Sequence, residues 1–193
     1  MTSIILLGPP GVGKGTQAAW LAKFLDVPAI STGQIFRANI EDQTELGKLA
    51  QDYMDKGEFV PDSVTNPMVT ARLSAPDAAR GFVLDGYPRS LDQAHALRDT
   101  MAREHWHIDA VLELSAPEQK LIERLKKRAG EEHRSDDTAD VFEHRLEVYW
   151  ERTEPLATYY ADQDLLDVVD GSGTPDEVAQ LMRDALRARG LVR

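Results

Sequence analysis

The 193-residue sequence contains no cysteine. Without thiols the chain can form neither a disulfide nor a thiolate zinc site, and it has no cysteine nucleophile. A long apolar run is also missing from its start, where residues 4–7 are apolar and Gly8 ends the run. Four apolar residues with no basic segment before them are too few for a signal peptide or a membrane span. We therefore expect a soluble cytoplasmic protein without a membrane partner.

Positive charge is scarce as well. The chain has 22 Lys and Arg residues against 33 Asp and Glu residues, a formal net charge of −11 at pH 7. Such a balance argues against a nucleic-acid partner and against binding to lipid headgroups, because both bind to positive surfaces. It leaves room for a small anionic substrate, because a pocket can be locally basic inside an acidic protein.

Short apolar segments alternate with segments that have helical character. The expected strands are residues 4–7, 27–30, 81–84, 110–114 and 165–169. The expected helices are residues 13–25, 43–56, 62–73, 90–104, 117–129, 138–161 and 175–189. This alternation predicts one α/β domain with a mostly parallel sheet covered by helices on both faces. Two segments depart from it: residues 31–60 resemble a small helical insertion, and the polar residues 130–137 a mobile loop.

The most informative motif follows the first expected strand. Gly8, four further residues and then Gly13-Lys14 have the spacing of a phosphate-binding loop. Glycines let successive backbone N–H groups converge on one anion, the next helix adds its N-terminal partial charge, and Lys14 can reach the β- and γ-phosphates. A plain glycine-rich turn is the alternative, but the flanking strand and helix favour the phosphate loop. Its contacts with ATP would come from Gly11, Val12, Gly13, Lys14, Gly15 and Thr16.

Two features bear on magnesium. After Lys14 comes Gly15, so the hydroxyl that usually binds Mg²⁺ is displaced by one residue to Thr16. We therefore expect Mg²⁺ to be carried by ATP and held mainly by phosphates and water, with no direct protein ligand. Asp85 ends an apolar segment and could hold the ion through water; its alternative role is a turn residue.

From the phosphate loop onward the sequence resembles the adenylate kinase family of nucleoside monophosphate kinases. The matching segments follow that family's order and spacing from residue 4 to about residue 178: residues 8–16, 30–33 with Arg37, 85–89 with Gln93, 124–128, 134–137 with Arg145, and 170–173. The resemblance implies a P-loop NTPase-type core (1–30, 61–126 and 138–193), a helical NMP-binding insertion (31–60) and a short lid loop (127–137). It implies reversible Mg²⁺-dependent phosphoryl transfer from ATP to AMP, giving two ADP, in the homeostasis of adenine nucleotides. Long lids in this family can carry a cysteine-rich zinc site, so this short lid without cysteine predicts no zinc.

The resemblance also assigns roles to individual residues. AMP would be bound by Thr32, Arg37, Glu58, Phe59, Val60, Gly86, Tyr87, Pro88, Arg89, Gln93, Arg134 and Arg145, with Tyr87 standing where Phe is common. Transfer would depend on Lys14, Asp85, Arg89, Arg124, Arg128, Arg134 and Arg145. ATP would also contact Arg128 and Gly173. We expect Asp136 and Asp137 either to hold the lid arginines or only to cap the next helix, and we expect a monomer.

Several of these residues have plainer alternatives. Arg37 could be solvated on its helix, and Arg124 and Arg128, four residues apart on one helix face, could belong to a solvated basic stripe. Gln93 could cap the helix that begins after Ser90, and Gly173 could be only a turn glycine. Phosphoryl transfer favours the functional reading of the arginines, because guanidinium groups stabilise the negative charge of the moving group.

Two other functions compete with this one. A UMP/CMP kinase is the nearest rival, but a Gln at position 93 matches the donor and acceptor of adenine. A regulatory ATP-binding module without transfer activity is opposed by the second set of anion-binding residues, Arg37 and Arg89. The sequence shows no pairing of histidine and carboxylate at catalytic spacing. Transfer to a phosphate oxygen, which is already ionised at pH 7, needs no such general base.

Overall fold

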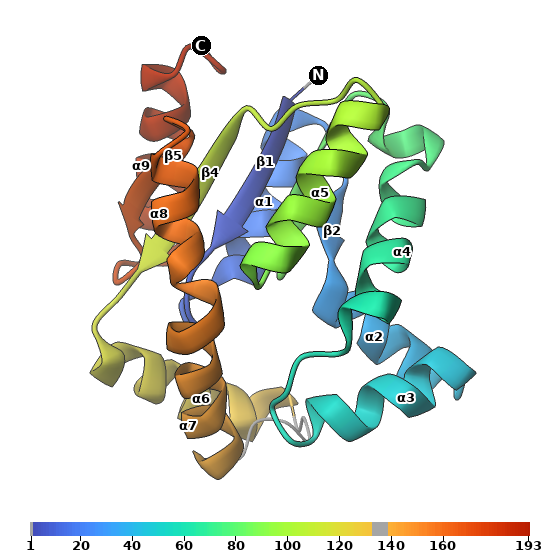
Figure 1. Ribbon diagram of the computed structural model, residues 1–193. Helices are drawn as coiled ribbons and strands as arrows, with labels where there is room; N and C mark the ends of the chain where they lie inside the picture. Colours follow the sequence, from blue (N-terminus) through green and yellow to red (C-terminus); the bar gives the residue numbers. More distant parts are fainter. Residues whose placement is uncertain (1, 133–138) are drawn as a thin grey trace.

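The computed structural model describes residues 2–132 and 139–193, and the side chains of residues 2–125 and 140–193. At its centre lies a parallel sheet with the strand order β2-β3-β1-β4-β5 (Figure 1). Its strands are β1 (Thr2–Leu7), β2 (Ala29–Ser31), β3 (Gly81–Asp85), β4 (Ala110–Ser115) and β5 (Leu166–Asp170). The expected α/β class with a five-stranded parallel sheet is confirmed.

Helices cover both faces of the sheet. They are α1 (Lys14–Leu25), α2 (Thr32–Glu41), α3 (Glu45–Met54), α4 (Asp62–Leu73), α5 (Leu91–Arg103), α6 (Glu118–Glu132), α7 (Ala139–Val148), α8 (Pro155–Ala161) and α9 (Pro175–Ala188). A short 3₁₀ helix η1 (Pro76–Ala78) precedes β3, and a π-helical turn η2 (Tyr149–Thr153) joins α7 to α8. The single helix expected over residues 138–161 is thus, from residue 139 on, a run of α7, η2 and α8.

The side chains of β1 show why the strand is apolar throughout. Ile4 and Leu6 belong to one core, which includes residues of α1, α6, α7 and α9. Ile5 and Leu7 belong to the other, which includes residues of α4, α5 and α8. Because successive side chains of a strand point to opposite faces, a strand buried on both faces needs a continuous apolar run.

The second strand begins later than the sequence suggests. Residues 27–30 were expected to form it, but β2 spans Ala29–Ser31. Asp26, which follows the last residue of α1, has a left-handed conformation (φ 55°). The N–H of Val27 still donates to the carbonyl of Ala22 at 3.0 Å. Val27 therefore completes the end of α1, and the strand starts after it.

Helices α2 and α3 lie together beyond the end of the sheet (Figure 1). They share a small core of their own around Phe36, Ala50 and Val60. Their connection is fixed by Thr44, whose hydroxyl donates to Asn39 Oδ1 at 2.8 Å and accepts from the N–H of Gly47 at 3.0 Å. This small core is distinct from the two cores of the sheet, and Ile35 of α2 packs against the second of them.

Gly47 is a point of close approach between α3 and α2. A Cβ added there would lie 2.0 Å from the carbonyl oxygen of Asn39. We predict that Gly47→Ala lowers the free energy of unfolding by about 1–3 kcal/mol, because backbone cannot move aside as a flexible side chain can. Gln51→Ala at an exposed position of the same helix is the control, with an expected change within about 0.5 kcal/mol. Urea unfolding measures both, and an unchanged midpoint for Gly47→Ala would contradict the close packing.

Candidate active site

The site lies where the parallel strands end. The loops after β1, β3 and β5 meet there, as expected for an open parallel sheet. The largest cavity at this edge measures about 630 Å³ and is called here the phosphate-loop cleft. Its walls come from residues 10–17, from Asp85 and Arg124, and from the loop that contains Gly171 and Gly173.

The phosphate loop turns its backbone toward this cleft. Gly8 and Gly13 have φ angles of 137° and 104°, which residues other than glycine rarely adopt. A Cβ on Gly8 would lie 2.4 Å from the carbonyl oxygen of Leu114, whereas a Cβ on Gly13 would meet nothing within 4 Å. Gly13 is also the N-cap of α1 and offers no side chain to cap it. The N-terminus of α1 is therefore open to an anion in the cleft.

Lys14 reaches back across the loop. Its Nζ donates to the carbonyl oxygens of Gly8 (2.5 Å) and Pro9 (2.9 Å). The side chain is half-buried and lines the cleft. The ammonium group thus lies beside the open helix terminus, where a polyphosphate would meet both.

Arg124 of α6 ties the two walls of the cleft together. Its Nη1 donates to the carbonyl oxygens of Val12 (3.0 Å) and Gly171 (2.7 Å), and its Nη2 to those of Ser172 (3.1 Å) and Gly173 (2.8 Å). The guanidinium is therefore not solvated on an outer stripe. It fixes the phosphate loop against the loop after β5, and Gly173 is one of the residues that it holds.

Asp85 lies across the cleft from the phosphate loop. Its Oδ2 accepts a hydrogen bond from the hydroxyl of Ser31 at 3.2 Å. The same Oδ2 is 3.8 Å from the position of a Cβ on Gly15, so the carboxylate faces the start of α1. Ser31 was not singled out from the sequence, although it stands directly before Thr32.

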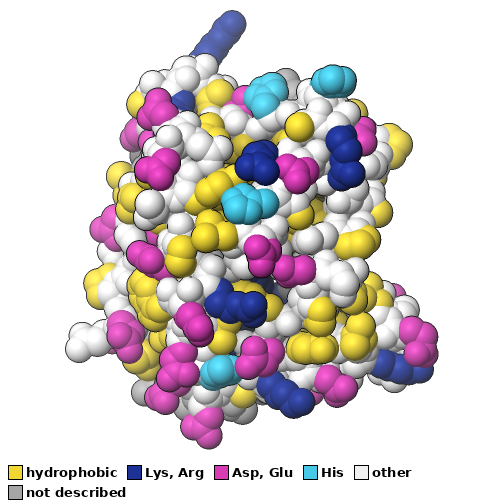
Figure 2. Space-filling model, viewed as in Figure 1, with side chains coloured by type: hydrophobic (Ala, Val, Ile, Leu, Met, Phe, Trp, Pro, Cys, Tyr) yellow, Lys and Arg dark blue, Asp and Glu magenta, His cyan; other side chains and the backbone are white. Residues whose placement is uncertain are grey.

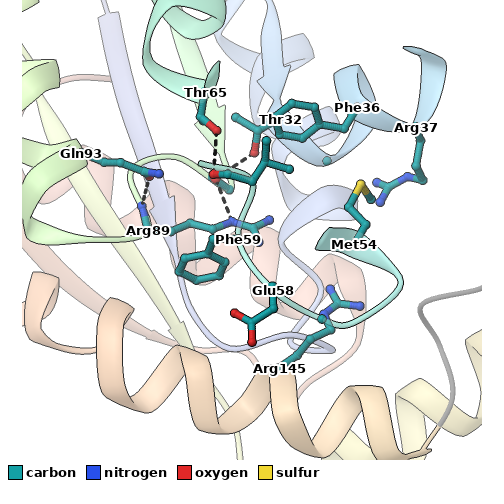
Figure 3. A pocket seen from close by; sticks show the side chains of 14 residues that line it. Thr32, Phe36, Arg37, Met54, Glu58, Phe59, Thr65, Arg89, Gln93 and Arg145 are labelled. Carbon is teal, nitrogen blue, oxygen red and sulfur yellow. Dashed lines mark hydrogen bonds between the residues drawn. The ribbon is translucent and has the colours of Figure 1, made fainter. Parts of the chain in front are cut away.

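A second pocket, the insertion pocket, lies between the α2–α3 pair and the loop after β3 (Figure 3). It is lined by most of the residues expected to bind AMP: Thr32, Arg37, Glu58, Phe59, Val60, Gly86, Arg89, Gln93 and Arg145. The carbonyl oxygen of Gly86 accepts from the hydroxyl of Thr32 at 2.8 Å and from Nε of Arg89 at 2.9 Å. These bonds fix two side chains of the pocket to one peptide group.

Both polar atoms of the Gln93 side-chain amide are held by hydrogen bonds. Its Oε1 accepts from the backbone N–H of Arg89 (2.8 Å), and its Nε2 donates to Asp62 Oδ1 (2.6 Å). Its own backbone N–H donates to the Ser90 hydroxyl, which caps α5. Gln93 thus takes part in the helix cap, while its buried amide lines the pocket wall.

Tyr87 and Pro88, which were also expected to bind AMP, do not line the insertion pocket. Tyr87 is almost fully buried and lies in the core, where its hydroxyl donates to Asn66 Oδ1 at 2.9 Å. Burial raises the pKa of this phenol well above its ordinary value, so it stays neutral. Tyr87 lines none of the three cavities at this edge of the sheet.

A third, small pocket shares lining residues with both of the others. It is called the connecting pocket and is lined by Lys14, Pro88, Arg89, Arg145 and Tyr149, among others. Arg89 and Arg145 line the phosphate-loop cleft, the insertion pocket and the connecting pocket alike. Cationic side chains are thus concentrated where the linings of the three cavities overlap.

Comparison with known proteins agrees with this arrangement. Residues 6–165 match the sequence profile described as Adenylate kinase. The chain belongs to the adenylate kinase family. It is 53% identical over 187 residues to the adenylate kinase of Mycobacterium tuberculosis (strain H37Rv), covering 97% of this chain and 98% of that protein. It is 50% identical over 186 residues to the adenylate kinase of Thermobifida fusca, covering 96% and 98%.

The remaining adenylate kinase residues expected from the sequence lie partly outside the described part of the chain. Arg134, Asp136 and Asp137 are among the residues that the structure does not describe. Arg128 lies on α6, in a part of the helix where the structure describes the backbone and not the side chains. No helix in the described part of the chain is long and apolar enough to cross a membrane. Among the residues that the structure describes, no group of three or more His, Asp or Glu side chains is placed to hold a metal ion.

The structure adds residues that the sequence did not indicate. Thr153 is buried, and its hydroxyl donates to the carbonyl oxygen of Arg89 at 2.8 Å. Tyr149, from the same turn η2, donates to Glu113 Oε1 at 3.4 Å, and burial raises the pKa of that carboxyl. Their contacts are made over 36 to 64 residues of sequence, so no local motif marks them.

One ion pair joins the insertion pocket to α7. Nε2 of His144 lies 2.8 Å from Glu58 Oε1, and its Nδ1 lies 3.5 Å from Glu147 Oε2. The hydrogen bond to Glu58 raises the pKa of His144, and Glu147 adds to this effect. Because a raised pKa favours the protonated form, the pair is charged at low pH and weakens as the pH rises through that pKa.

We predict that Glu58→Gln lowers the pKa of His144 toward its ordinary value of about 6.5. Glu147→Gln, which removes the same charge from the longer contact, should lower it less. Proton NMR titration of the imidazole signals measures both variants. A larger drop for Glu147→Gln would show that the bond between α7 and residue 58 does not set the pKa.

Proposed function

We propose that the phosphate-loop cleft holds ATP, that the insertion pocket holds AMP, and that the phosphoryl group moves between them through the connecting pocket. As in its family, the reaction is the reversible transfer of the γ-phosphoryl group of ATP to AMP, giving two ADP. The observation that carries the proposal is that Arg89 and Arg145 line all three cavities. One pair of guanidinium groups can therefore contact the acceptor phosphate and the transferred group at once.

The reaction does not depend on proton transfer by the protein. The attacking atom is a phosphate oxygen of AMP that is already ionised at neutral pH, so the reaction needs no general base. Alignment of the two phosphates and stabilisation of spread negative charge are what the site must supply. Lys14, the open N-terminus of α1, Arg89 and Arg145 provide positive groups along that path.

The donor set fits a magnesium ion that enters with ATP. When bound, Mg²⁺ neutralises charge on the β- and γ-phosphates. Asp85 and Ser31 present one carboxylate and one hydroxyl at the cleft, too few to hold such an ion alone. These two residues would hold it through water, and the phosphates would complete the shell.

The acceptor base would be read in the insertion pocket. Thr32 and Gln93 are buried there, and their polar atoms are fixed by neighbours, so they present a defined hydrogen-bond pattern. A rigid pattern discriminates well, because a wrong base leaves buried polar groups unpaired. We assign AMP specificity to these two side chains. We further propose that the enzyme works as a monomer in the cytoplasm, without zinc.

We predict that Lys14→Met lowers kcat about 100- to 1,000-fold, the cost of removing one preorganised donor to the transferring group. Lys23→Met removes the same charge from an exposed position of the same helix and should keep near-normal turnover. Steady-state kinetics measures both variants, with circular dichroism to confirm that each is folded. Near-normal turnover of Lys14→Met would refute the role of this side chain.

The joined cavities themselves are tested by a bisubstrate probe. Two adenosines linked by five phosphates should bind at least about 100-fold more tightly than ATP or AMP alone, because one molecule then fills both sites. Replacing one adenosine by cytidine should cost about tenfold or more. Isothermal titration calorimetry gives both constants. A probe that binds no better than ATP would exclude adjoining sites, and equal binding of the cytidine form would refute adenine reading by Thr32 and Gln93.

A further inference from the structure

The ring of Phe59 has two arginines beside it. The Cζ atom of Arg89 lies 5.2 Å from the ring centroid, and that of Arg152 lies 5.7 Å from it. Phe59 follows the α2–α3 pair, Arg89 follows β3, and Arg152 belongs to the π-helical turn η2. Three segments that are far apart in the sequence therefore meet at one aromatic ring.

The two arginines differ in their relation to the site. Arg89 lines all three cavities, whereas Arg152 is exposed and lines none of them. In the described part of the chain, Arg152 takes part in no ion pair or side-chain hydrogen bond, and its contact is with the ring. A guanidinium within about 6 Å of a ring centroid is attracted to the negative face of the ring. Arg152 can therefore act on the site only through Phe59 or through its field.

The turn η2 also holds Arg89 directly. The hydroxyl of Thr153, the neighbour of Arg152, donates a hydrogen bond to the carbonyl oxygen of Arg89 at 2.8 Å. Nε of Arg89 is bound to the carbonyl of Gly86 at 2.9 Å. The backbone and the Nε are thus fixed by hydrogen bonds, and the Phe59 ring supports the end of the side chain that would meet a phosphate.

We propose that Arg152 is a positioning residue for the acceptor nucleotide: by binding the Phe59 ring it holds that ring against Arg89, and so orients the Arg89 guanidinium toward the AMP phosphate. The inference rests on the proposed function, in which AMP occupies the insertion pocket. Arg152 does not touch the substrate. Its effect should appear mainly in AMP binding, because Phe59 lines the insertion pocket and not the phosphate-loop cleft, where ATP would be held.

Steady-state kinetics of four variants tests this proposal. Arg152→Ala should raise the KM for AMP about two- to fivefold, the size of an exposed cation–π contact, with a smaller change in the KM for ATP. Arg152→Lys should recover most of the loss, because an ammonium group also binds an aromatic face. Arg98→Ala removes the same charge from an exposed site on α5 that lines none of the three cavities, and should change neither KM. Phe59→Leu keeps an apolar residue but removes the ring.

The double variant Phe59→Leu with Arg152→Ala gives the decisive comparison. If Arg152 acts through the ring, its loss should change the KM for AMP less than about 1.5-fold in the Phe59→Leu background. An equal effect in both backgrounds would show a through-space effect of charge and overturn the proposal. An unchanged KM for AMP in Arg152→Ala, or an equal rise in the KM for ATP, would overturn it as well. A wild-type enzyme that did not phosphorylate AMP would instead refute the proposed function, before any variant is compared.

Discussion

The phosphate loop depends on one constraint, which is that the carbonyl groups of a tight glycine-rich turn must find hydrogen-bond donors. Carbonyl oxygens turned toward protein need donors, because unpaired buried acceptors are costly. Lys14 donates to Gly8 and Pro9, and Arg124 donates to Val12. The cationic side chains that line the cleft thus also satisfy carbonyl groups of the loop. Arg124 of α6 thus supports a local glycine motif from a position more than 100 residues away in the sequence.

The same arrangement resolves the contrast between an acidic protein and anionic substrates. The net charge of −11 is a property of the whole chain, and in Figure 2 acidic side chains are scattered over the outer surface. Lys14, Arg89 and Arg145 gather instead around the connecting pocket. Like charges at such a junction repel one another, and hydrogen bonds to backbone carbonyls offset part of that cost for Lys14 and Arg89. A polyphosphate entering the junction meets cations that are already held in place.

The parts of this enzyme that could be predicted from the sequence are those whose signal is local. The phosphate loop is one stretch of residues, and the apolar runs of the strands follow from burial on both sheet faces, as at Ile4 and Ile5. The predicted start of β2 at Val27 was wrong. Val27 completes the end of the preceding helix through a backbone hydrogen bond, which its apolar side chain does not reveal. Helical spacing put Arg124 on one face of its helix but could not name its partners, which are carbonyls brought together by the fold. For the same reason neither the bond of Gln93 to Asp62 nor that of Thr153 to Arg89 could be foreseen.

The contacts around the insertion pocket differ in kind from those that hold the sheet. The α2–α3 pair has a small apolar core, which Val60 and residues of α4 complete. The residues after this pair meet α7 and η2 at Gly57, which lies close to Val141 and Arg145, and through an ion pair at Glu58 and a cation–π contact between Phe59 and Arg152. The exposed ion pair and the cation–π contact are each worth roughly 1 kcal/mol or less. Such contacts can break and reform without disturbing either core. Contacts of this kind suit an adenylate kinase, which must admit AMP and then exclude water, because closure of the site keeps water from the transferred group.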